Sequence, residues 1–98
     1  MFKGWISREE EANIPVFNSY DEARKYFQNK YGKDFILETI DYVDGQKCYF
    51  HAIVVSWENY RRLQKAMERH ETGNLGIDVM ASSQPVQILE DGSVHIVH

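Results

Sequence analysis

The side chains that could act in nucleophilic catalysis are one cysteine and its nearest histidine. Cys48 is the only cysteine of the 98 residues, and His51 follows three positions later. A nucleophilic thiol needs a base within reach. Both residues lie in a segment with strand character, where side chains three positions apart point to opposite faces. We therefore expect Cys48 to be structural or inert, and we predict no catalytic residues.

The four histidines do not form a recognisable metal site. His51, His70, His95 and His98 are scattered along the chain, whereas a structural zinc site takes four ligands, usually as close pairs. The glycines also match neither of the phosphate-binding patterns G-x-G-x-x-G and G-x-x-x-x-G-K-[ST]. The sequence therefore predicts no metal site and no cofactor.

A possible acid–base pair consists of Glu38 and His51. The two residues face each other in the hairpin described below, and a carboxylate beside an imidazole could exchange a proton with a substrate. No other chemically active residue converges on this pair from the sequence. An enzyme is therefore the class of protein that we rank last.

A basic stripe runs along the second predicted helix. Arg61, Lys65 and Arg69 recur every four residues, with Arg62 beside them. Such a stripe could contact phosphate groups or an acidic protein. The simpler interpretation is a solvated helix face on which Glu58 pairs with Arg62. Because the chain carries a net charge of −4, nucleic-acid binding is the alternative function rather than the preferred one.

Composition places the chain among small folded domains. Hydrophobic residues make up 43% of the sequence and aromatic residues 13%, which is enough to form a core. A length of 98 residues suits one domain, spanning 1–98. The single cysteine fits a reducing compartment, and no apolar run approaches a membrane span or the core of a signal peptide. We therefore expect a cytoplasmic protein without membrane contact.

The strongest structural signal is a β-hairpin in the middle of the chain. Phe35–Val43 and Gln46–Val55 are rich in β-branched and aromatic residues. Asp44-Gly45 between them suits a two-residue turn with positive φ at both positions. The pairs that follow are Val43–Gln46, Asp41–Cys48, Ile40–Tyr49, Glu38–His51 and Ile36–Ile53. A one-residue bulge would change these pairs.

Two helices carry clear end signals. Ser19 is a good N-cap, and Gly32 is placed to end a helix in a left-handed conformation. These two residues bound a helix over about Tyr20–Tyr31. Ser56 is the N-cap of a second helix, which we predict over about Trp57–Glu71.

The remaining segments are expected to add strands. Met1–Ser7 and Leu75–Ala81 are candidate strands, and Val86–Leu89 forms a second hairpin with Val94–Val97. The charged segment Arg8–Asn13 is expected to be a loop or one frayed turn. The resulting order is β-α-β-β-α-β-β. It predicts an α+β domain with a mainly antiparallel sheet and two helices packed on one face.

The two faces of the central hairpin are predicted to differ. One face, together with one side of each helix, is the better candidate for the core. The predicted core residues are Phe27, Phe35, Leu37, Phe50, Ala52, Val54, Tyr60, Leu63 and Met67. The opposite face mixes aromatic, aliphatic and charged side chains, namely Glu38, Ile40, Tyr42, Tyr49, His51 and Ile53.

This mixed face gives the functional hypothesis. Tyrosine is enriched in protein interfaces, and exposed apolar patches mark contact sites. We predict a small non-catalytic interaction module of the accessory or inhibitor type, which binds a protein partner or a second copy of itself. Trp5 and Trp57 could extend the face. Two simpler interpretations are a solvent-facing sheet with ordinary cross-strand pairs and a face covered by one end of the chain.

Overall fold

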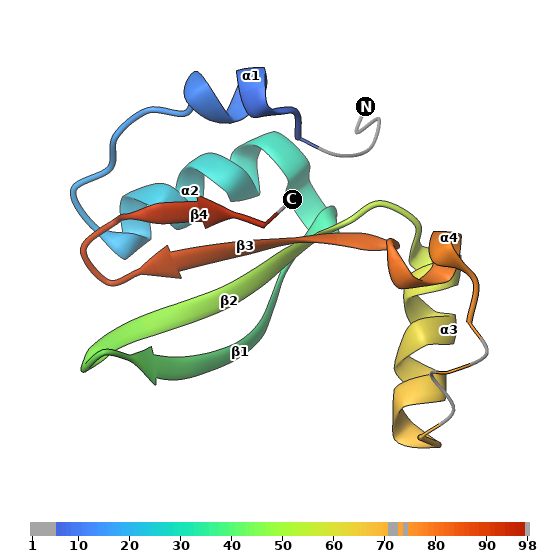
Figure 1. Ribbon diagram of the computed structural model, residues 1–98. Coiled ribbons are helices and arrows are strands. Elements are labelled where there is room, and N and C mark those ends of the chain that lie inside the picture. The colour runs from blue at the N-terminus through green and yellow to red at the C-terminus, as the bar shows by residue number, and fades with distance from the viewer. Residues whose placement is uncertain (1–5, 71–72, 74, 98) are drawn as a thin grey trace.

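The computed structural model describes residues 6–70, 73 and 75–97, in which four strands form one antiparallel sheet in the order β1-β2-β3-β4 (Figure 1). The strands are β1 (Phe35–Val43), β2 (Gln46–Val54), β3 (Ser83–Leu89) and β4 (Val94–Ile96). The helices are α1 (Arg8–Ala12), α2 (Tyr20–Tyr31), α3 (Trp57–Glu68) and α4 (Ile77–Met80), with a short 3-10 helix η1 at Gly32–Asp34. The predicted α+β class and antiparallel sheet are confirmed, and the predicted order of elements is matched in outline.

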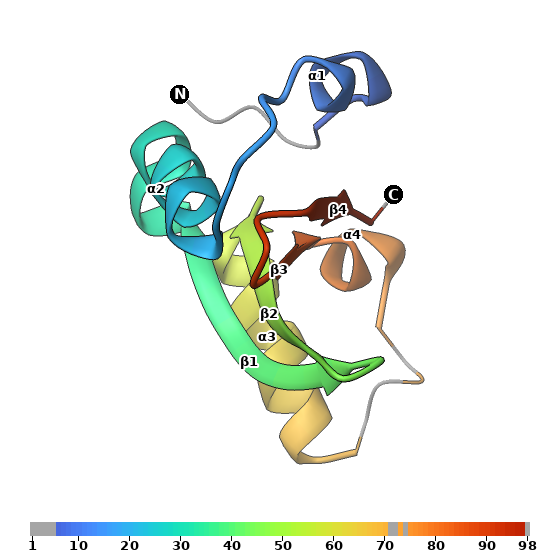
Figure 2. The same ribbon diagram turned by 90° about the vertical axis from the view of Figure 1, so that its left-hand side faces the viewer.

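The two predicted helices, α2 and α3, lie on opposite sides of the sheet, so the prediction that both pack on one face is wrong. Figure 2 shows α2 on one side, and α4 with α3 beside it on the other. The reason is visible in β2, where four consecutive residues, His51 to Val54, are all buried. Side chains alternate along a strand, so such a run needs cover on both faces. The main core lies under α2 and consists of Ile6, Ala23, Phe27, Phe35, Ile53, Val86, Ile88 and Ile96.

The central hairpin is confirmed close to its turn. Asp44 and Gly45 have φ values of 52° and 80°, as the two-residue turn requires. Ile40 is opposite Tyr49, as predicted. The predicted pairs between Ile40 and the turn are also formed. The β2 strand ends at Val54, one residue earlier than expected.

A bulge at Glu38 overturns the predicted pairs beyond this point. Leu37 is opposite His51 and Thr39 is opposite Phe50, so Glu38 is an extra residue on β1. The predicted pairs Glu38–His51 and Ile36–Ile53 are therefore wrong. An extra residue reverses the faces of everything that precedes it. It moves Phe35 and Leu37 onto the face that carries His51 and Ile53.

The predicted core is confirmed only in part. Phe27, Phe35, Ala52, Val54 and Tyr60 are buried. Leu37 and Met67 are 48% and 53% exposed, so their predicted burial is wrong, and Phe50 and Leu63 are half-buried. Leu37 is exposed because β1 is the edge strand of the sheet. Met67 is exposed because α3 projects beyond the end of the sheet (Figure 1).

The predicted helix starts are confirmed. The Ser19 hydroxyl accepts from the backbone N–H of Glu22 at 3.2 Å, and the Ser56 hydroxyl caps α3 in the same way. The prediction of a loop or frayed turn at Arg8–Asn13 missed α1. The signal for α1 is a capping box, in which the Glu10 backbone N–H donates to the Ser7 hydroxyl and the Ser7 backbone N–H donates to the Glu10 carboxylate.

The C-terminal half departs further from expectation. Leu75–Ala81 is not a strand, because Ile77–Met80 forms α4, and β3 begins at Ser83 rather than Val86. β3 accommodates Pro85 at the end of its pairing with β4, where the Pro85 carbonyl accepts from the Val97 N–H at 3.1 Å and no N–H of residue 85 is needed. Helix α3 ends at Glu68, with Arg69 as its C-cap, so the predicted extension to about Glu71 is too long. The Trp5 prediction and most of the Met1–Ser7 strand lie outside the described residues.

Candidate functional site

β1 is an edge strand that is exposed along most of its length. In the described part of the chain it pairs only with β2. Every residue from Leu37 to Val43 is exposed, and three of the apolar side chains, Leu37, Ile40 and Tyr42, are 48%, 44% and 69% exposed. A long apolar edge strand presents unpaired backbone groups that another strand can bind.

The register fixes which backbone groups of β1 point outward. Val43 and Gln46 flank the two-residue turn and form a hydrogen-bonded pair, and such pairs alternate with non-bonded ones along the strands. Ile40 and Tyr42 therefore direct their N–H and C=O groups away from β2. The Tyr42 N–H donates instead to the carboxylate of Asp41 at 2.8 Å. This contact satisfies one of the outward amides locally.

The exposed apolar side chains of β1 share one face of the sheet. Leu37 is opposite His51, and Ile40 is opposite Tyr49, so both lie on the side of α2, as does Tyr42. Tyr49 is half-buried and its ring stacks on Tyr20 of α2 with centroids 3.5 Å apart. The exposed strip of β1 is therefore continuous with an aromatic surface that α2 holds in place.

Helix α3 anchors the first half of β1. The Tyr60 hydroxyl donates to Glu38 Oε2 at 2.7 Å, and the Trp57 Nε1 donates to Asp34 Oδ1 at 2.8 Å. Burial, together with the Glu38 carboxylate, raises the pKa of Tyr60, so the hydroxyl remains a donor at neutral pH. These contacts hold the bulge from the α3 side. The regular open edge is therefore the segment from Thr39 to Val43.

Two predicted site residues lie in the core instead of on an open face. His51 is 4% exposed and Ile53 is fully buried, so the prediction that they are accessible is wrong. α2 covers them, because the bulge and the burial of both sides of β2 make this the main core face. Glu38, Ile40 and Tyr42 are exposed, and Tyr49 is half-buried.

The His51 ring is held between two polar partners. Its Nδ1 lies 3.0 Å from the Ile36 carbonyl oxygen, and its Nε2 lies 2.9 Å from the Tyr20 hydroxyl. Burial lowers the pKa of His51 to about 4, so the ring is neutral at pH 7, with Nδ1 donating to Ile36 and Nε2 accepting from Tyr20. Glu38 binds Tyr60 instead. The predicted acid–base pair is therefore not assembled in this structure.

The basic stripe of α3 lies at the surface. Arg61, Arg62, Lys65 and Arg69 are all exposed. The expected Glu58–Arg62 ion pair is not formed between these two described residues, and Arg62 donates instead to a neighbouring asparagine side chain. The Arg61 guanidinium lies 5.5 Å from the centre of the Trp57 ring. The stripe thus keeps its positive charge.

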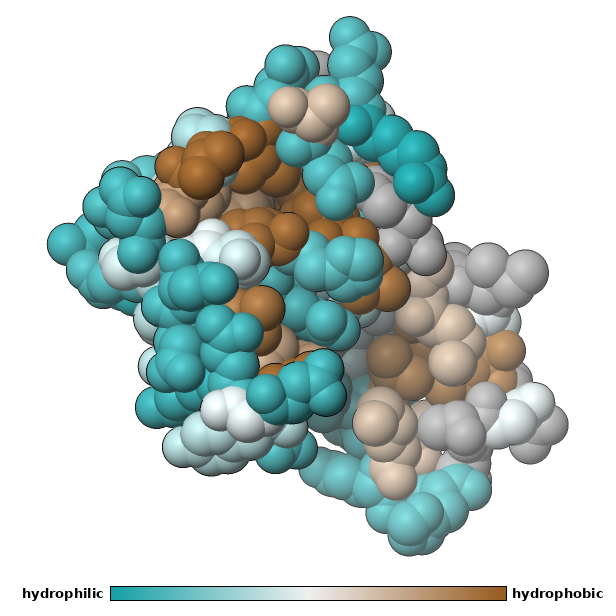
Figure 3. Space-filling model, turned by 60° about the vertical axis from the view of Figure 1, so that its left-hand side comes forward, coloured by the Kyte–Doolittle hydropathy of each residue, from teal (hydrophilic) through white to brown (hydrophobic). Residues whose placement is uncertain are grey.

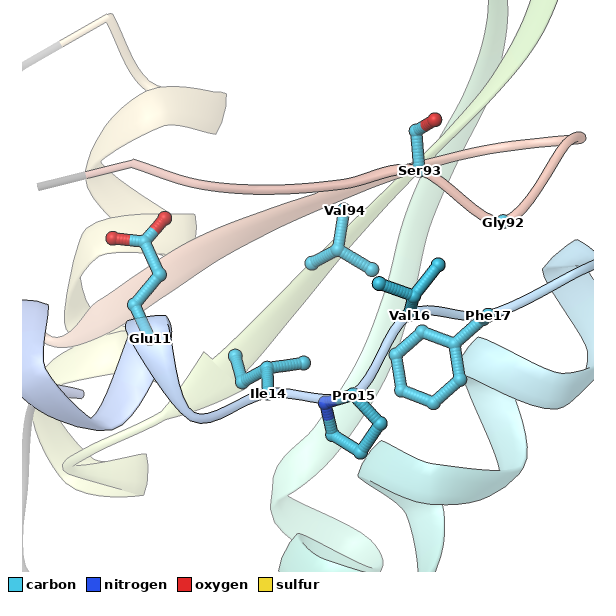
Figure 4. A pocket seen from close by; sticks show the side chains of 8 residues that line it. All are labelled: Glu11, Ile14, Pro15, Val16, Phe17, Gly92, Ser93 and Val94. Carbon is cyan, nitrogen blue, oxygen red and sulfur yellow. The ribbon is translucent and has the colours of Figure 1, made fainter.

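One hollow lies between the segment that precedes α2 and the turn that joins β3 to β4 (Figure 4). Its volume is about 230 Å³. The lining residues are Glu11, Ile14, Pro15, Val16, Phe17, Gly92, Ser93 and Val94. Gly92 has a φ of 94°, and a Cβ there would lie 2.6 Å from the Phe17 carbonyl oxygen, so glycine permits the close approach of the two segments. The lining mixes apolar side chains with polar groups and brings together no set of catalytic or metal-binding side chains.

A second hollow of about 170 Å³ lies beside Cys48, near the hairpin turn. Cys48 is 2% exposed, and burial, with a smaller effect of Asp41, raises the pKa of its thiol. A thiol of this kind is a poor nucleophile.

On the face shown in Figure 3, apolar side chains reach the surface in several places between hydrophilic ones. Exposed apolar area alone therefore does not single out a site, whereas the open backbone of β1 does.

Within residues 6–70, 73 and 75–97, no three histidine, cysteine or acidic side chains come together as a metal-binding group. No helix in that part of the chain is long and apolar enough to cross a membrane. Comparison with protein-family models, curated proteins and solved structures finds no match to this chain.

Proposed function

We propose that this chain is a non-catalytic protein-binding module, which takes up an extended segment of a partner protein as a further strand beside β1. The observation that carries the proposal is the open edge from Thr39 to Val43, with Ile40 and Tyr42 exposed beside outward backbone groups. In strand addition, backbone hydrogen bonds give affinity and alternate side chains give specificity.

The proposal keeps part of the predicted contact surface and moves its centre. Tyr42, Ile40 and Tyr49 stay in it, because they form the strip on the α2 side of the edge. His51 and Ile53 support it from inside the core, where they position β2. The buried thiol of Cys48 and the separate partners of Glu38 and His51 support a non-catalytic role, and one free cysteine suits the cytoplasm.

Replacing Ile40 by proline should abolish binding of the partner, whereas replacing it by alanine should only weaken it. Both variants lose the same apolar side chain, but only proline removes the outward N–H that an added strand would use. The β1–β2 pairing should survive in both, because that N–H does not face β2. The measurement is photo-crosslinking in the source cells from a benzophenone amino acid placed at Tyr42.

The control is the same crosslinker at Val16, which is 94% exposed and lies far from β1 in sequence. A defined partner should be crosslinked from position 42, not from position 16, and should disappear in the Ile40→Pro background. Equal crosslinking from both positions, or crosslinking from position 42 that persists with proline, would contradict the proposal.

The alternative function is nucleic-acid binding by the basic stripe of α3. It is favoured by the exposure of Arg61, Arg62, Lys65 and Arg69 on a helix that projects from the sheet (Figure 1). It is opposed by the net charge of −4, since nucleic-acid affinity rests mainly on positive charge. A gel shift with an oligonucleotide that weakens steeply with salt would favour this alternative.

A further inference from the structure

The charged residues of β1 are all acidic. Glu38 and Asp41 lie within the strand, and Asp34 and Asp44 flank it. Lys47 lies on β2 opposite Tyr42, where its ammonium group is 5.1 Å from the centre of the Tyr49 ring. The open edge thus presents carboxylates and apolar side chains to an incoming strand.

This charge distribution disfavours a second copy of the chain as the occupant. Antiparallel pairing of two Thr39–Val43 segments about their centre would place the Asp41 carboxylates of the two copies opposite each other. Like charges on neighbouring strands destabilise pairing. The two molecules would also approach with a net charge of −4 each, which slows their encounter.

We propose that the segment bound by β1 alternates apolar residues with lysine or arginine, and that a basic residue lies opposite Asp41. This inference rests on the proposed function and specifies its partner. Side chains that face each other across a strand pair lie on the same side of the sheet. Residues opposite Ile40 and Tyr42 therefore meet the apolar strip on the α2 side, and the residue between them meets Asp41 on the other side.

Asp41 has a second part in this arrangement. In the free chain its carboxylate accepts from the Tyr42 N–H at 2.8 Å, so one outward N–H of the edge is already hydrogen-bonded. A partner strand brings a carbonyl that can accept from the same N–H. The Asp41 carboxylate is then released from its own backbone and can bind the partner's cation. Recognition of charge and pairing of backbone are thereby coupled at one residue.

The test uses three soluble, fluorescent nine-residue peptides with central sequences Val-Lys-Val-Lys-Val, Val-Thr-Val-Thr-Val and Val-Glu-Val-Glu-Val. Fluorescence anisotropy with the full chain should show that the lysine peptide binds about tenfold more tightly than the threonine peptide at low salt, and that the glutamate peptide binds least. Asp41→Lys should reverse the order of the lysine and glutamate peptides. Glu9→Lys, an equal charge change on the exposed surface of α1, should preserve it.

The outcomes separate the inference from the proposed function. If the threonine peptide binds as tightly as the lysine peptide and Ile40→Pro blocks both, the charge inference is overturned and strand addition stands. If Glu9→Lys acts as strongly as Asp41→Lys, the peptide is drawn only by the net charge of the chain and the inference is overturned. If no peptide binds, or if Ile40→Pro leaves lysine-peptide binding unchanged, both the inference and the proposed function are overturned.

Discussion

Replacing Phe27 by alanine should lower the free energy of unfolding by about 3–5 kcal/mol. Phe27 is fully buried where α2 meets the sheet, and its ring stacks on Phe35 with centroids 5.5 Å apart. Its neighbours on α2 are themselves large rings, Tyr26 and Tyr31, which cannot collapse into the space without leaving their own contacts. The measurement is urea denaturation followed by tryptophan fluorescence.

Met67→Ala is the matched control for this substitution. Met67 is also a large apolar residue on a helix, but it is 53% exposed and lies on α3. Its replacement should cost about 1 kcal/mol or less, as surface substitutions usually do. Similar losses from the two variants would mean that α2 does not close the main core.

Acidification should destabilise the fold through His51 by about 3 kcal/mol between pH 7 and pH 4. Burial lowers the pKa of His51 to about 4, whereas an unfolded chain has a histidine pKa of about 6.5. Between these values the unfolded state binds a proton that the folded state does not. The stabilisation is therefore complete above pH 6.5 and is lost as the pH falls towards 4.

The variant His51→Gln isolates this effect from the titration of carboxylates. The free energy of unfolding of the variant should depend less on pH than that of the wild type over the range from 6.5 to 4, whatever its stability at pH 7. His95→Gln, which replaces an exposed histidine, should retain the wild-type pH dependence. If His51→Gln also retains it, His51 is not a buried neutral histidine.

Local signals in the sequence were enough to predict the framework of this fold. Asp44-Gly45 predicted the hairpin, since few other residues adopt two successive positive φ values at low cost. Ser19 and Ser56 predicted two helix starts, because their hydroxyls satisfy backbone N–H groups that the helix leaves unpaired. Each of these signals concerns neighbours in the chain and needs no knowledge of the tertiary fold.

The assignment of the hairpin faces failed because it depended on one residue that leaves no local signal. The extra residue at Glu38 is stabilised by Tyr60, 22 positions away, and sequence patterns do not show such a contact. One inserted residue exchanged the faces of Phe35 and Leu37 and made the expected open face the main core. The residue pattern of β2 could not show which face is buried, because β2 is apolar on both sides.

The candidate site could be predicted only as a set of residues. Ile40, Tyr42 and Tyr49 were identified because exposed aromatic and aliphatic side chains suggest contact. That β1 is an edge strand follows from the order of the strands, which in turn depends on β3 pairing with β2. Long-range pairing of this kind is set by the whole core and cannot be deduced from either strand alone.

Amide hydrogen exchange at Ile40 tests the central claim most directly. The Ile40 N–H points away from β2, so it should exchange rapidly in the free chain, whereas the amides of Asp41 and Val43, which face β2, should be protected. Saturation with the Val-Lys-Val-Lys-Val peptide should slow exchange at Ile40 by at least about tenfold and leave α3 unchanged. Strong protection of Ile40 in the free chain, or exchange at Ile40 that stays fast when the peptide is bound, would contradict an open β1 edge that binds by strand addition.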